Sequence, residues 1–157
     1  METADSLRGL HYRQVFKNNM SEFTEPEITN QKIGNKKDFT CISFYPDLSK
    51  FGMAELDRDI VALLTKRAYD MAGVTDSRVR VYLNGKRIGV NDFSGYVDLY
   101  LQNEEHKELP KIAEKKHQRW EVYCSLSDGQ FQQVSFVNGI CTSRGGTHVN
   151  YITDQIV

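Results

Sequence analysis

Residues 136–155 of this 157-residue chain read FVNGICTSRGGTHVNYITDQ, and this stretch decides how the remaining sequence is interpreted. An extended, β-favouring beginning leads through Gly145-Gly146 into a segment in which Val149 and Ile152 recur at helical spacing. Paired glycines favour a backbone with positive φ, and threonine is a residue type that caps helices. The stretch therefore predicts a strand, a tight loop and a helix capped by Thr147.

The Gly145-Gly146 loop has two interpretations. Positive φ and helix capping explain its residue types without a ligand, whereas free amides at the start of a helix could bind an anion. Basic side chains near the loop could also contact a phosphate backbone, namely Lys115, Lys116, Arg119 and Arg144. Glu108 and Glu114 dilute that positive charge. The residues by themselves favour the structural interpretation.

Further upstream, strand patterns and helix patterns alternate. Period-two alternation and β-favouring composition predict strands at 11–19, 27–29, 38–45, 78–84, 120–126 and 131–138. The segment 38–45 is interpreted as a central strand, and 131–138 as the partner of 120–126. Asn84-Gly85 is a strong signal for a two-residue hairpin, because a type I′ turn needs positive φ at both positions.

Two further helices are expected. Apolar residues in 56–71 recur at i, i+4, i+7 and i+8, and Gly73 is placed to end that helix in a left-handed conformation. A shorter helix is predicted over 93–101, and 103–116 reads as a charged surface loop. The composition changes near residues 90–92, between two β–α groups. We therefore predict an α+β fold.

Composition excludes several classes of protein. The chain has 20 Lys+Arg against 21 Asp+Glu, which excludes a polybasic nucleic-acid arm and an acidic disordered tail. No apolar run approaches the roughly 20 residues of a membrane helix, and the polar start is not a signal peptide. Three widely spaced cysteines, expected as buried or half-buried thiols, argue against a disulfide scaffold and for an intracellular protein.

Motifs that carry chemistry are scarce. The sequence contains no GxxxxGKS/T loop, no GxGxxG and no HExxH. The four histidines lack metal-ligand spacing, and His106 and His117 are expected in solvent. The carboxylates Asp57 and Asp59 stand where a helix begins, so we interpret them as structural. These residues alone predict no reaction.

The same stretch nevertheless resembles a known family. Its pattern FVNxIxTxxGGTHVxYxxDQ is similar to the eukaryotic type IIA DNA topoisomerases and, more distantly, to bacterial gyrases. Further similar segments occur upstream in the same order: ETA (2–4), RQVFKNNM (13–20), PDLSKF (46–51), LDRDIVALLTKRAYDMAG (56–73), FSGYVDLYL (93–101) and QQVSF (132–136). The chain departs from the pattern at Gly139, where serine or asparagine is usual, and at Cys141, where alanine is usual.

The resemblance implies a domain organisation. Residues 1–90 resemble the C-terminal part of a GHKL (Bergerat) ATPase domain, and residues 91–157 the first part of a transducer domain. The final helix is still apolar where the sequence stops, so we expect a truncated transducer. The resemblance also implies a nuclear, homodimeric enzyme that uses ATP and Mg²⁺ to pass one DNA duplex through another.

One functional residue can be carried over from the family. Thr40 falls where the family presents a threonine hydroxyl to the adenine end of ATP, although a threonine in a strand is also an ordinary β-favouring residue. The family's DxGxG and GxxGxG nucleotide motifs, magnesium-binding residues, transducer lysine and DNA-linked tyrosine all lie outside this sequence. We therefore expect no catalytic residue and no metal ligand here.

The isolated chain is predicted neither to hydrolyse ATP nor to relax DNA. A truncated sheet with an open edge could also leave it poorly folded. The chain could instead be an inert truncated product or a stand-alone interaction module on the same scaffold. DNA binding through residues 115–119 would show a steep dependence on salt.

Overall fold

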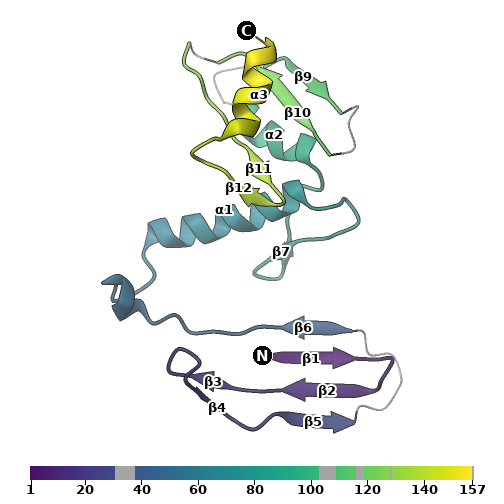
Figure 1. The fold of residues 1–157 in the computed structure, drawn as a ribbon, viewed down its shortest axis with the longest axis vertical. Coiled ribbons are helices and arrows are strands. Elements are labelled where there is room, and N and C mark those ends of the chain that lie inside the picture. The colour runs from purple at the N-terminus through teal and green to yellow at the C-terminus, as the bar shows by residue number, and fades with distance from the viewer. Residues whose placement is uncertain (31–37, 103–108, 116–118, 128, 157) are drawn as a thin grey trace. The chain divides into compact units, whose positions relative to one another are not determined.

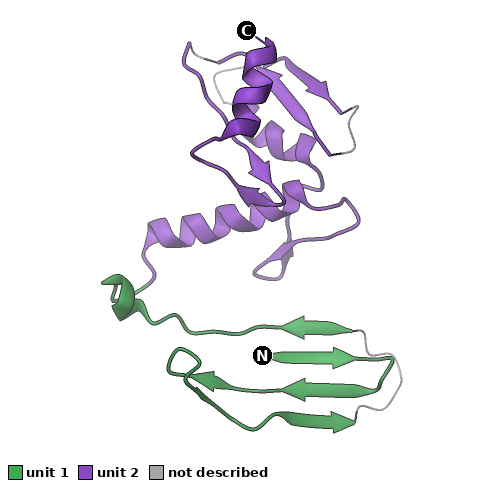
Figure 2. Cartoon of the chain, viewed as in Figure 1, with its two compact units in different colours: residues 1–55 green, residues 56–157 purple. Residues whose placement is uncertain are grey.

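The chain forms two compact units, residues 1–55 and 56–157 (Figure 2). The computed structural model describes residues 1–30, 38–102, 109–115, 119–127 and 129–156. Strands and helices are both present, which confirms the predicted α+β class. The division after Glu55 is not the expected domain boundary near residue 91, which stays a prediction.

The first unit is built on an antiparallel sheet with the strand order β5-β2-β1-β6 (Figure 1). Its strands are β1 (Glu2–Asp5), β2 (Leu10–Arg13), β5 (Glu27–Asn30) and β6 (Phe39–Cys41). A small hairpin of β3 (Phe16–Lys17) and β4 (Glu22–Phe23) extends from it, and η1 (Leu48–Phe51) follows. The strand predicted at 27–29 is confirmed as β5.

The prediction for 38–45 is only partly correct. β6 has three residues and lies at an edge of the sheet, hydrogen-bonded to β1 alone among the described strands. The β-favouring residues Ile42 and Phe44 follow it, pair with no strand in the described part of the chain, and are 70% and 76% exposed. A β-favouring composition reports that a segment suits a sheet, but it does not supply the neighbour that makes a strand central.

The second unit contains the helices and the short hairpins. Its elements are α1 (Arg58–Val74), β7 (Tyr82–Leu83), β8 (Lys86–Arg87), α2 (Phe93–Leu101), β9 (Lys111–Glu114), β10 (Val122–Ser125), β11 (Phe136–Val137), β12 (Ile140–Cys141) and α3 (Thr147–Ile156). All three helices lie where the periodicity predicts them. None of the described helices has both the length and the hydropathy that a membrane crossing requires.

The ends of α1 are set by side chains. The Asp57 carboxylate accepts a hydrogen bond from the Ile60 amide at 2.9 Å and is the N-cap of the helix. Its role is structural, as we predicted, although we expected it to act through its charge at the helix start and not as a cap. At the other end, the Thr75 hydroxyl donates to the Met71 carbonyl at 2.6 Å. Gly73 lies inside the helix and does not end it, so its predicted C′ role is wrong.

Two Asn-Gly hairpins occur in this unit. Asn84 and Gly85 have φ of 49° and 78°, which confirms the predicted type I′ turn between β7 and β8. Asn138 and Gly139 have φ of 49° and 77° and join β11 to β12, a hairpin that we did not predict. Gly139 therefore supplies a turn, and only residues 136–137 of the expected strand 131–138 form a strand.

The missed hairpin changes the strand pairing. β11 pairs with β12 because the chain reverses at Asn138-Gly139, so it cannot continue as the partner of 120–126. β10 pairs instead with β9, inside the segment 103–116 that we predicted to be a loop. That loop prediction is therefore wrong over β9, and residues 103–108 and 116 lie outside the described residues.

Candidate functional site

Thr40, the predicted nucleotide contact, lies on the edge strand β6 opposite Thr3 of β1. The two hydroxyl oxygens are 3.1 Å apart, and the Thr3 hydroxyl donates to the Phe39 carbonyl at 2.8 Å. Since Thr3 has only one hydroxyl proton, Thr40 is the donor in the bond between the two threonines. The Thr40 oxygen keeps lone pairs that can accept a hydrogen bond, and its side chain is exposed.

The start of β6 is held by a further contact. The Ser6 amide donates to the Asp38 carboxylate at 2.6 Å, and hydrogen bonds from Ser6 lower the pKa of Asp38 below its usual value. Asp38 is therefore an anion at neutral pH, two residues before Thr40. This arrangement fixes the backbone that carries the Thr40 hydroxyl.

The Gly145-Gly146 loop is closed by a polar network. The His148 Nε2 atom lies 3.0 Å from the Thr142 hydroxyl and 3.3 Å from the Ser135 hydroxyl, and those two hydroxyls are 2.6 Å apart. A Cβ atom on Gly146 would lie only 3.0 Å from the His148 ring, and Gly146 has a φ of 148°. Glycine is required here both by φ and by the ring of His148.

This geometry supports the structural interpretation of the loop. Gln133 adds a hydrogen bond from its Nε2 atom to the Ser143 carbonyl at 3.0 Å. α3 begins at Thr147 itself, so Gly146 takes the position before the helix that we predicted for Thr147. Gln133 and Ser135 also belong to this network, and no sequence motif marks either of them. Recognising the turn at residues 138–139 would have placed Ser135 opposite Thr142.

Two of the four basic residues near the loop, Lys115 and Arg119, interact with other groups. The Lys115 ammonium pairs with Glu121 at 2.6 Å and lies 5.2 Å from the centre of the Tyr123 ring. Contact with Glu121 raises the pKa of Lys115. Arg119 also has an interaction partner, while Lys116 and Glu108 lie outside the described residues. This pairing weakens the case for a phosphate-binding patch at 115–119.

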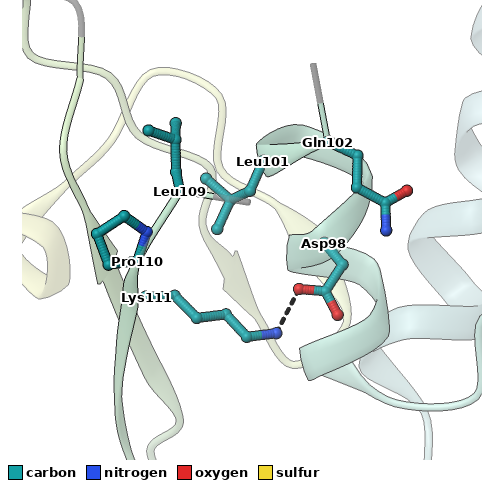
Figure 3. A pocket seen from close by; sticks show the side chains of 6 residues that line it. All are labelled: Asp98, Leu101, Gln102, Leu109, Pro110 and Lys111. Atoms are coloured by element: carbon teal, nitrogen blue, oxygen red, sulfur yellow. Dashed lines mark hydrogen bonds and ion pairs between the residues drawn. The ribbon is translucent and has the colours of Figure 1, made fainter. Parts of the chain in front are cut away.

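A pocket of about 340 Å³ lies between the end of α2 and the start of β9 (Figure 3). Its lining residues are Asp98, Leu101, Gln102, Leu109, Pro110 and Lys111. The Lys111 ammonium points at the Asp98 carboxylate and pairs with it, and it also donates to the Ser94 hydroxyl at 3.1 Å. Because these two charges neutralise each other, the lining residues that the structure describes offer no free charge to a nucleotide phosphate.

The remaining candidate ligands do not gather. Within the described part of the chain, no three His, Cys, Asp or Glu side chains converge in a way that could hold a metal ion. Cys124 and Cys141 are half-buried as expected, but Cys41 is exposed because β6 lies at an edge. His106 and His117 lie outside the described residues.

Known proteins resemble the whole chain. DNA topoisomerase 2 of Arabidopsis thaliana is 53% identical over 160 residues, which cover 99% of this chain and 11% of that protein. DNA topoisomerase 2-alpha of Homo sapiens is 48% identical over 160 residues, covering 100% of this chain and 10% of its own length. A family model described as DNA gyrase B matches residues 92–157. The chain thus spans about a tenth of these curated relatives.

Solved structures agree with these relatives. The ATPase region of Saccharomyces cerevisiae topoisomerase II bound to dexrazoxane is 47% identical, with a TM-score of 0.88 over 99% of this chain and 40% of that one. The ATPase and transducer domains of DNA topoisomerase II from Balamuthia mandrillaris are 41% identical, with a TM-score of 0.85 over 98% of this chain and 38% of that one. The chain therefore belongs to the DNA topoisomerase II family and corresponds to a segment of its ATPase region.

Proposed function

We propose that this chain serves as part of an ATP-dependent type II DNA topoisomerase that changes DNA topology by double-strand passage. The observation that carries the proposal is the TM-score of 0.88 at 47% identity over 99% of the chain, against an ATPase region. In this proposal residues 1–90 supply the late strands and the long helix of the nucleotide domain. Residues 91–157 supply the first part of the transducer, which the DNA gyrase B match to 92–157 supports.

Thr40 is the proposed contact for ATP in this chain. Its hydroxyl proton is directed to Thr3, so its oxygen is left to accept a hydrogen bond, and an adenine amino group is a donor of the right kind. The exposed edge position leaves that oxygen accessible. A valine at this position would keep the shape and lose the acceptor.

We propose that the other functional groups of the whole enzyme lie outside this segment. We assign no magnesium ligand to the described residues, since no three suitable side chains converge there. DNA as the substrate, assembly as a homodimer and a nuclear location are proposed from the relatives named DNA topoisomerase 2. Hydrolysis of ATP and cleavage of DNA are proposed to need residues outside this chain.

A chimera tests the proposal directly. The matching segment of Saccharomyces cerevisiae DNA topoisomerase 2, which is 46% identical over 171 residues, is replaced by this chain. The chimera is expected to relax supercoiled plasmid only when ATP is present. A folded chimera that binds no nucleotide and relaxes no DNA would overturn the proposal and support an inert or purely interacting module.

The role of Thr40 is tested within the same chimera. Thr40→Val should raise KM for ATP by about fivefold, because one hydrogen bond to the nucleotide is lost, whereas Thr40→Ser keeps the hydroxyl and should stay near the unmodified chimera. Thr29→Val, on the strand β5 at the opposite edge of the sheet, is the matched control and should leave KM unchanged. Equal KM values for Thr40→Val and Thr29→Val would remove Thr40 from the nucleotide site.

A further inference from the structure

A buried polar network joins α1 to α2, which lie against each other in the second unit (Figure 1). The Tyr96 hydroxyl of α2 donates to the Asp70 carboxylate of α1 at 2.6 Å. Lys66 of α1 donates to both oxygens of that carboxylate at 2.9 and 3.0 Å. Asp70 and Tyr96 are only 3% and 2% exposed, so this bond lies in the interior.

The shape of the helices enforces the same arrangement. A Cβ atom on Gly73 would lie 2.6 Å from the Cβ and Cγ atoms of Tyr96, so α2 approaches α1 at a position where only glycine fits. Phe93 and Phe136 surround the Tyr96 ring, with ring centres 6.1 and 5.6 Å away. The tyrosine is therefore held by packing on its ring and by a hydrogen bond at its tip.

The polar bond specifies geometry more than it adds stability. A buried carboxylate loses its hydration, and apolar residues of similar size often serve a core equally well or better. A hydrogen bond between Asp70 and Tyr96 is directional, however, and it allows one orientation of α2 on α1. Burial and the bond to Asp70 also raise the pKa of Tyr96, which keeps its hydroxyl protonated as the donor.

The network joins residues on the two sides of the point where the family match begins. The match to DNA gyrase B covers residues 92–157, so it includes Tyr96 and excludes Asp70. In the proposed function, α1 belongs to the nucleotide-domain part and α2 to the transducer part. The Asp70–Tyr96 bond is thus a direct, buried link between the two.

We propose that Asp70 and Tyr96 are positioning residues that set the orientation of α2 on α1, so that a change in the nucleotide-domain part reaches the transducer part and ATP hydrolysis is coupled to DNA passage. This inference rests on the proposed function. Both side chains are buried and therefore not accessible to a substrate. Loss of the bond therefore changes how much ATP is used for each passage, and leaves the binding of ATP as it was.

The yeast chimera described above provides the assay. Its ATP hydrolysis, KM for ATP and plasmid relaxation are measured together, and the ATP consumed per relaxation event is calculated. Tyr96→Phe removes the bond to Asp70 together with the 2.9 Å hydrogen bond between the Tyr96 and Tyr100 hydroxyls. It should leave KM within about twofold and raise the ATP consumed per event by at least about fivefold, the factor that one hydrogen bond is worth. Tyr69→Phe is the matched control, since Tyr69 packs beside the same core on α1, and it should leave the ratio unchanged.

A double variant separates positioning from folding. Tyr96→Phe leaves the Asp70 carboxylate buried with Lys66 alone, and this could weaken the fold. Asp70→Leu/Tyr96→Phe replaces both partners with apolar groups, so the core stays packed without the directional bond. We expect this variant to fold and to remain uncoupled.

The outcomes are distinct. An inactive chimera with the unmodified chain would overturn the proposed function before this inference is reached. With an active chimera, an unchanged ratio in Tyr96→Phe would overturn the inference, as would normal coupling in Asp70→Leu/Tyr96→Phe. A raised ratio in both variants, with Tyr69→Phe unchanged, supports the positioning role.

Discussion

The two halves of α1 carry one continuous amphipathic pattern but have different surroundings. In the first half, Leu63 and Leu64 are 61% and 56% exposed. In the second half, Asp70, Ala72 and Gly73 are buried against α2. The first half is richer in large apolar residues, yet no described residues cover Leu63 and Leu64.

The difference shows what selects a packing site on a helix. Ala72 and Gly73 have small side chains, which let α2 come close, and the Tyr96 ring fills the space above them. Leucines on the first half would form a core only if another element lay over them. Periodicity therefore identifies the apolar face, while close approach depends on where the small residues lie.

The largest expected effect on stability comes from adding a side chain at Gly73, where the second half of α1 contacts α2. Gly73→Val places side-chain carbons where the Cβ and Cγ atoms of Tyr96 already lie 2.6 Å from an added Cβ. We expect a loss of about 3 kcal/mol in the free energy of unfolding, the upper end for an overpacked core, measured by urea unfolding. Gly89→Val is the control, because an added Cβ there meets nothing within 4 Å. Similar losses in both variants would contradict a close α1–α2 contact.

High pH should weaken the same half of the helix. The pKa of Tyr96 is raised by its burial and by the bond to Asp70, whereas an unfolded tyrosine ionises near pH 10. Above about pH 10 the unfolded chain releases this proton and the folded chain keeps it, so the free energy of unfolding falls as pH rises, by up to about 1.4 kcal/mol per pH unit.

Tyr96→Phe should lose this contribution to the pH dependence of the unfolding free energy. The difference between the two proteins should be constant from pH 8 to 9 and shrink above pH 10. A constant difference up to pH 11 would contradict the prediction.

The first half of α1 depends instead on its cap. Asp57→Ala removes the acceptor for the Ile60 amide and should cost about 1 kcal/mol of unfolding free energy. Asp57→Asn keeps an acceptor oxygen and should stay near wild type in the same urea titration. If both variants lose the same amount, the charge of Asp57 at the helix start matters more than the hydrogen bond.

The sequence predicts local structure here better than it predicts partners. Two alternating segments flank Asn84-Gly85 and so predict its turn, while the same dipeptide at 138–139 lies inside a segment whose pattern indicates one long strand. That pattern also hides the opposition of Ser135 and Thr142, and with it the network around His148. Gly73 was interpreted from its own backbone alone, although its role depends on Tyr96, a residue far along the chain.

The family could be predicted from ordered motifs because these motifs extend over nearly the whole chain and do not depend on packing. Thr40 illustrates the limit of that approach. A resemblance selects the position, and the structure adds that its hydroxyl donates to Thr3 and is exposed. No property of the residue in its own strand distinguishes a nucleotide contact from an ordinary β-favouring threonine.

The smallest expected effect lies at the exposed leucines of α1. Leu63→Gln replaces a side chain that is 61% exposed by a polar residue with similar helix propensity, so the unfolding free energy should change by no more than about 0.5 kcal/mol. Ala72→Gln, at a position that is 3% exposed, is the matched change in the other half and should be severely destabilising in the same urea titration. A loss above about 1.5 kcal/mol in Leu63→Gln would mean that the first half of the helix is covered in the folded chain, because an exposed leucine contributes little and a buried one contributes that much. Both halves of α1 would then be buried, and they would differ only in which element packs against each half.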